Sequence, residues 1–88
     1  MIETERTTIE LRYPVILDGT EMKALCMRRP KVRDQILMEK SGMAGKSAAE
    51  KEVLLFANLC EIAPGDVEEL DMGDYRRLQE AYSAFLEE

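Results

Sequence analysis

The stretch "TIELRYPVILDGTEMKALCM", residues 8–27, carries an Asp-Gly pair at Asp18 and Gly19 between two apolar runs. Asp-Gly favours a two-residue hairpin turn, because both turn positions adopt positive φ angles. The apolar residues before the turn occupy alternate positions, as in a half-buried strand: Ile9, Leu11, Tyr13, Val15 and Leu17. We therefore predict a β-hairpin over residues 8–28.

The turn predicts the pairing of the two strands. An unbroken ladder from it gives the pairs Leu17–Thr20, Val15–Met22, Tyr13–Ala24 and Leu11–Cys26. Leu25 and Met27 then point to the opposite face. Pro14 cannot donate a ladder hydrogen bond, so the first strand should lie at an edge or carry a bulge. A hairpin alone is marginally stable, so it must pack on other elements.

Helical patterns follow the hairpin. Pro30 suits the first position of a helix, with Val32, Ile36 and Leu37 on one side of it. A second helix fits residues 47–61, which are apolar on several sides. The sequence "APGD", residues 63–66, ends that helix and can open a short helical turn.

The last helix is predicted to begin at Asp71. Asp71 and Asp74 have the spacing of a capping box, and Leu70 and Tyr75 have that of a hydrophobic staple. An apolar stripe at helical spacing follows: Tyr75, Leu78, Tyr82 and Phe85. The chain is therefore predicted to be one α+β domain over residues 1–88, a hairpin (8–28) followed by about three packed helices (30–87).

The net charge of −6 is unevenly distributed. Residues 1–60 hold ten basic and nine acidic residues, whereas residues 61–88 hold two and nine. Four of the basic residues surround Pro30: Arg28, Arg29, Lys31 and Arg33. This cluster fits a charged strand-to-helix junction, a docking site for an acidic partner or a nucleic-acid patch. It lacks interleaved aromatic residues, and the chain is acidic, so we predict no nucleic-acid partner.

Catalytic and metal-binding patterns are missing from the sequence. There is no His, which excludes imidazole metal sites and Ser-His or Cys-His catalytic pairs. No glycine-rich phosphate loop, Gly-x-Ser-x-Gly elbow or Cys-x-x-Cys pair occurs. The acidic run Asp66, Glu68, Glu69, Asp71 and Asp74 lacks the pattern of a calcium loop and suits helix capping. We predict no enzyme activity, no cofactor and no metal.

The chain is expected to reside in a reducing cytoplasm. Cys26 and Cys60 lie within apolar runs, which predicts two buried free thiols. The sequence contains neither a signal-peptide core at "MIETERTTIE" nor an apolar run of membrane-spanning length.

Three stretches resemble one known family. They are "PVILDGTEMKAL" (14–25), "MRRPKVRD" (27–34) and "IAPGDVEELDMGDYRRLQEAYSAFL" (62–86). Their order is similar to that of the tail assembly chaperones of P2-like and Mu-like phages and prophages. Such proteins begin with a short hairpin, have an Arg-x-Pro junction and end in a Leu-Asp-x-x-Asp-Tyr-x-x-Leu stretch. The corresponding positions here are Arg28, Pro30, Leu70, Asp71, Asp74, Tyr75 and Leu78.

The resemblance implies a non-catalytic role in assembly. Family members bind the tape-measure protein while the tail tube polymerises and are absent from the finished virion. A frameshifted longer form of the same chain is implied as a further partner. We expect the second and last helices to frame the partner groove, with these contact residues: Leu55, Leu59, Ile62, Tyr75 and Tyr82. A cytoplasmic adaptor domain and a homo-oligomeric subunit remain alternatives.

Overall fold

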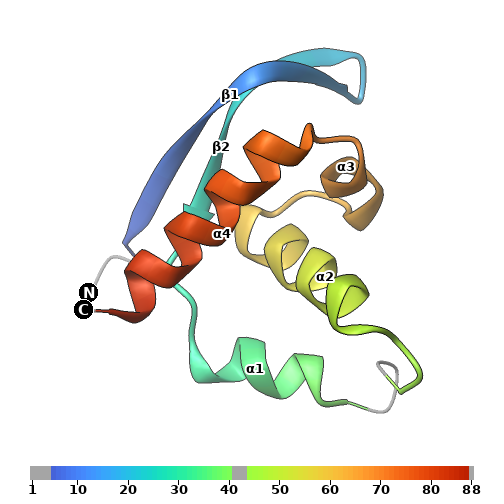
Figure 1. Ribbon diagram of the computed structural model, residues 1–88, viewed down its shortest axis with the longest axis vertical. Helices are drawn as coiled ribbons and strands as arrows, with labels where there is room; N and C mark the ends of the chain where they lie inside the picture. The colour runs from blue at the N-terminus through green and yellow to red at the C-terminus, as the bar shows by residue number, and fades with distance from the viewer. Residues whose placement is uncertain (1–4, 41–43, 88) are drawn as a thin grey trace.

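The computed structural model describes residues 5–40 and 44–87 and has the predicted α+β order (Figure 1). Strands β1 (Arg6–Leu17) and β2 (Thr20–Arg28) form a two-stranded antiparallel sheet. The helices are α1 (Val32–Met38), α2 (Ala48–Cys60), α3 (Pro64–Glu68) and α4 (Met72–Leu86). The hairpin-plus-helices prediction is confirmed, and α3 is the short helical turn expected at "APGD".

The hairpin turn adopts the predicted conformation. Asp18 and Gly19 have φ angles of 50° and 77°, and the pairs Leu17–Thr20 and Val15–Met22 form as expected. The register then shifts between Val15 and Glu10. Four residues of β1, 11–14, stand opposite Lys23 alone, because Glu10 pairs with Ala24. The irregularity predicted from Pro14 is therefore present, and the predicted pairs Tyr13–Ala24 and Leu11–Cys26 are wrong.

The shift by an odd number of residues reverses the face that β2 presents to the core. Leu25 pairs with Ile9, and both are buried, as is Met27. Cys26 is exposed instead of buried, contrary to the prediction. The prediction failed because it extended the turn-proximal register through Pro14.

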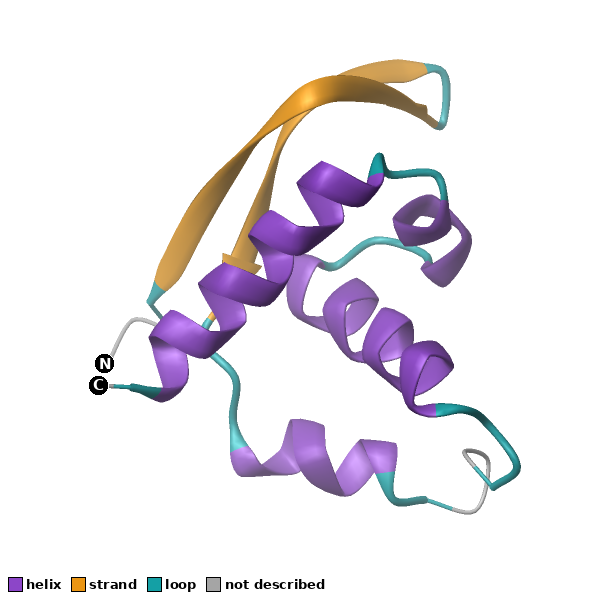
Figure 2. Ribbon diagram, in the orientation of Figure 1, coloured by secondary structure: helices purple, strands orange, loops and turns teal. Residues whose placement is uncertain are grey.

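The core lies between the hairpin and the helices. Its buried residues form one apolar cluster: Ile9, Leu11, Leu25, Met27, Phe56, Ala57, Leu59, Cys60, Val67, Leu70, Leu78 and Phe85. The apolar stripe predicted for α4 is confirmed, with Leu78 and Phe85 buried and Tyr75 and Tyr82 packed against the cluster. Figure 2 shows the hairpin curving around one side of the helices, with α4 running along it.

Helix α2 has the boundaries that its sequence predicts. Ser47 caps its first turn by accepting a hydrogen bond from the Glu50 N–H, and the Glu50 carboxylate accepts one from the Ser47 N–H. This reciprocal pair is a capping box. The helix ends at Cys60, and its C-cap residue Glu61 adopts the left-handed conformation with φ 58°.

Helix α1 differs from its prediction. Pro30 is not its first residue, because Lys31 is extended and serves as the N-cap. The side of α1 that faces inward carries Asp34 and Met38, whereas Val32 and Ile36 are 79% and 55% exposed. The main core cluster takes no residue from α1 among the described residues. Figure 1 shows α1 beside α2, at the end of the molecule away from the hairpin turn.

Candidate functional site

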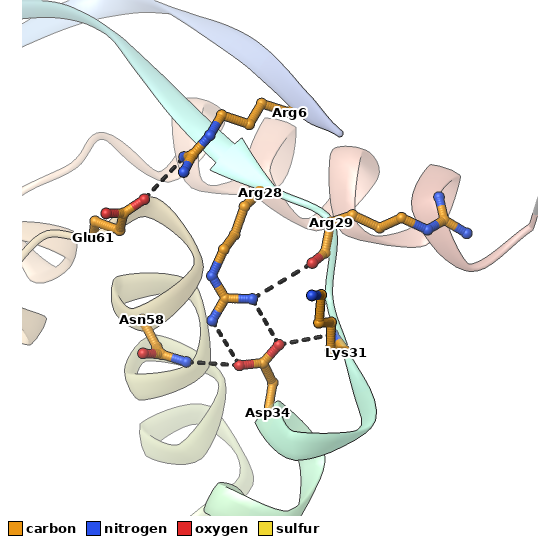
Figure 3. Close-up of polar contacts among 7 residues, drawn as sticks. All are labelled: Arg6, Arg28, Arg29, Lys31, Asp34, Asn58 and Glu61. Atoms are coloured by element: carbon orange, nitrogen blue, oxygen red, sulfur yellow. Dashed lines mark hydrogen bonds and ion pairs between the residues drawn. The ribbon is translucent and has the colours of Figure 1, made fainter. Parts of the chain in front are cut away.

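Arg28 and Asp34 form a buried ion pair where β2 leads into α1 (Figure 3). Two hydrogen bonds join them, Nη2 to Oδ1 at 2.7 Å and Nη1 to Oδ2 at 2.9 Å. The side chains are 13% and 3% exposed. A parallel two-bond contact of this kind is the strongest geometry available to a guanidinium and a carboxylate.

Asp34 also binds two other parts of the chain. Its Oδ2 accepts a hydrogen bond from the Lys31 N–H at 2.8 Å, and its Oδ1 accepts one from Asn58 Nδ2 at 2.9 Å. Arg28, Asp34 and Asn58, which we call the junction cluster, thus connect β2, α1 and α2 (Figure 3). The hydrogen bonds from Arg28 hold the pKa of Asp34 below its ordinary value.

The basic residues around Pro30 do not act as one patch. Arg28 points inward to Asp34. Arg29 lies over the Phe85 ring, with 5.6 Å from Cζ to the centroid, and its Nη1 is 3.8 Å from a Glu5 carboxylate oxygen. The predicted strand-to-helix junction is therefore observed. The sequence interpretation missed Asp34, although an acid three residues after Lys31 fits the first turn of a helix.

A second carboxylate joins α4 to the irregular part of β1. Asp74 is 1% exposed, and its Oδ1 and Oδ2 accept hydrogen bonds from the N–H groups of Arg12 and Tyr13 at 2.9 and 3.0 Å. Arg77 Nη1 donates to the Glu10 carbonyl at 3.0 Å. The predicted capping box is only half present. Asp71 caps α4 by accepting a hydrogen bond from the Gly73 N–H. Asp74 does not complete the box, because its carboxylate accepts the backbone N–H groups of β1 that the interrupted ladder leaves available.

Two of the predicted partner-binding residues, Tyr75 and Tyr82, lie at the contact between α2 and α4. Phe56 packs between Tyr75 and Tyr82, with ring centroids 5.6 and 5.7 Å away. The Tyr75 hydroxyl donates to Glu52 at 2.6 Å, and burial together with this bond raises the pKa of Tyr75.

The predicted contact residues differ in accessibility. Leu55, Ile62, Tyr75 and Tyr82 are partly buried. Leu59 is fully buried, so we reassign it to the core, where a partner cannot reach it. The contacts predicted for the other four stay predictions.

Residues 8–87 match the family model described as phage tail assembly chaperone proteins, E, or 41 or 14. The chain belongs to this family. The match covers nearly all of the hairpin and every described helix of the chaperone, and it confirms the resemblance inferred from the sequence. No curated protein and no solved structure is significantly similar to it.

The chaperone has an open groove between α1 and α2, with a volume of about 390 Å³. Its lining comprises the junction cluster and four further residues: Arg33, Ile36, Leu37 and Lys40. Arg33, Ile36 and Lys40 are exposed. We call this hollow the α1–α2 groove.

The described residues of the chaperone offer little for other kinds of site. Within 5–40 and 44–87, no three acidic or Cys side chains gather in a way that could hold a metal ion. No helix in the same ranges is long and apolar enough to cross a membrane. Cys60 is buried, and the loss of solvation raises its pKa to about 11.

Proposed function

We propose that this chaperone binds the tail tape-measure protein in the host cytoplasm while the tail tube assembles, and that it leaves before the virion is complete. The observation that carries the proposal is the family match over residues 8–87. The role is binding without catalysis. A frameshifted longer form of the chain is a further proposed partner.

The surface of the chaperone is consistent with binding a protein client. Within residues 5–40 and 44–87, six large apolar side chains are at least half exposed: Tyr13, Ile16, Val32, Ile36, Met72 and Leu86. A long helical client would carry apolar stripes that aggregate when they are left bare. A small protein with a net charge of −6 can cover such stripes and keep the complex soluble by charge.

The decisive experiment is co-expression of the chaperone with the proposed tape-measure client, followed by pull-down and size exclusion. We expect the client to be soluble only with the chaperone and to elute with it. A client that is soluble alone and elutes separately would contradict the proposal. Mass spectrometry of purified virions tests the second part, which fails if the chaperone is present at a fixed ratio to the tube protein.

The contact residues can be tested in the same assay. Leu55→Asp places a charge on the partly buried surface of α2 and should abolish co-elution while the circular dichroism spectrum stays native. Leu59→Asp is the matched control, since a charge at this fully buried position should unfold the chaperone. A folded Leu55→Asp variant that still binds the client would exclude Leu55 from the contact surface.

A further inference from the structure

Helix α1 presents an apolar face that nothing in the described chain covers. Val32 and Ile36 are one helical turn apart and are 79% and 55% exposed. Side chains at this spacing lie on the same face of a helix. The other side of α1 is held by Asp34, through the four hydrogen bonds of the junction cluster and the Lys31 N–H. The fold therefore fixes α1 in place while leaving this face open.

The charge around the α1–α2 groove is opposite to that of the whole chain. Arg28 and Asp34 neutralise each other in their ion pair. Arg33 and Lys40 remain as exposed cations in the lining, beside the apolar Ile36 and Leu37. The groove is basic and apolar although the protein has a net charge of −6. It therefore favours a partner that has an apolar side flanked by acidic side chains.

Nucleic acid fits this groove poorly. The lining, all of it described, contains no aromatic side chain on which a base could stack, and Ile36 and Leu37 would face a phosphate backbone with no gain from burial. An amphipathic helix fits both features, because it lays its apolar stripe into a groove and carries charges along the margins.

We infer that the α1–α2 groove binds an acidic amphipathic helix of the tape-measure protein. Apolar side chains of that helix cover Ile36 and Leu37 in the groove and the neighbouring side chain of Val32. Its flanking carboxylates pair with Arg33 and Lys40. This inference rests on the proposed function, which names the client but not the surface or the client segment. The groove meets α2 at Asn58, whereas the predicted contact residues Tyr75 and Tyr82 pack on α2 at Phe56.

The test uses overlapping fluorescent peptides that tile the tape-measure protein, titrated with the full chaperone and read by anisotropy. The peptides that bind are expected to be acidic, with apolar residues at helical spacing. The double reversal Arg33→Glu/Lys40→Glu should weaken their binding by about tenfold or more, because two attractive pairs become repulsive. Added salt should weaken the wild-type complex in the same direction.

Two matched controls separate the groove from general effects. Lys23→Glu/Arg76→Glu also reverses two exposed cations, so it changes the net charge by the same amount at sites away from the groove. Ile36→Asp should abolish binding, whereas Thr20→Asp adds the same charge at an exposed hairpin residue outside the groove lining and should leave binding intact. Circular dichroism checks that each variant is folded.

The outcomes distinguish a failure of the proposed function from a failure of the groove assignment. If wild type fails to bind the intact client in co-expression, the proposed function fails. If the intact client binds but the groove variants bind as tightly as their controls, or the bound peptides are basic, only the groove assignment fails. A short DNA or RNA duplex that binds wild type and is lost in Arg33→Glu/Lys40→Glu would replace the helix with nucleic acid as the occupant.

Discussion

Asp74 Oδ1 accepts a hydrogen bond from the Arg12 N–H at 2.9 Å, across 62 residues of sequence. The same carboxylate accepts a second bond from the next residue, Tyr13. These two N–H groups lie where β1 no longer pairs in register with β2. One side chain of α4 therefore stands in for a missing strand partner and fixes the hairpin against the helices.

Replacing Asp74 by Ala should cost about 2–4 kcal/mol of unfolding free energy, because it leaves two backbone donors without their acceptor. Asp71→Ala is the matched control, because it removes an exposed helix cap and should cost about 1 kcal/mol. Urea unfolding followed by circular dichroism measures both. Equal losses of unfolding free energy in the two variants would show that the Asp74 hydrogen bonds stabilise the fold no more than the exposed helix cap does.

Replacing Arg28 by Ala should destabilise the chain by about 3 kcal/mol, since the Asp34 carboxylate stays buried without its cation. Arg33→Ala removes an exposed cation five residues away and should change stability by less than about 0.5 kcal/mol. The same urea titration compares them. An Arg28→Ala variant as stable as Arg33→Ala would show that the ion pair does not hold the junction together.

Stability should fall in acid partly through Asp34. Its folded-state pKa is lowered by Arg28, so its contribution is complete above the unfolded-state pKa of about 3.9 and is lost as pH falls through the lower folded-state value. Asp34→Asn should be less stable than wild type at pH 7, and the difference should shrink below about pH 4. Urea midpoints measured across this range give the comparison. A constant difference at every pH would contradict the assignment.

The two thiols should react at very different rates. Cys26 is exposed, whereas Cys60 is buried and has a pKa raised to about 11 by burial, which disfavours the reactive thiolate. Ellman's reagent should therefore titrate Cys26 alone in the native chain and both thiols in urea. Cys26→Ser should abolish the native reaction, and a rapid native reaction in that variant would show that Cys60 is accessible.

Local signals in the sequence predicted most elements of the fold. Asp18-Gly19 predicted the turn, the apolar run within residues 47–61 predicted α2, and the stripe of α4 predicted its buried side. Each of these features depends on residues within a few positions of one another. The register beyond Pro14 could not be predicted in the same way, because the acceptor for the Arg12 and Tyr13 N–H groups lies in α4.

The orientation of α1 could not be predicted from its neighbouring residues either. The apolar spacing predicted that Val32 and Ile36 lie on one side of the helix, but the side that faces inward carries Asp34. That choice depends on Arg28 from the hairpin and Asn58 from α2, which form a polar pocket for the carboxylate. Among the predicted contact residues, Leu59 lies in the core for a related reason: the sequence showed that α2 is apolar on several sides but not which side the hairpin covers.

The weak apolar attachment of α1 has a consequence for motion. Because α1 contributes no described residue to the main core cluster, breaking the junction cluster would release it without opening the interior. Its amide protons should then exchange with solvent ahead of those in α2 and α4, as a separate unit of lower local stability. The chain thus has a short helix whose opening depends on the hydrogen bonds to one carboxylate, that of Asp34, and leaves the rest of the fold intact.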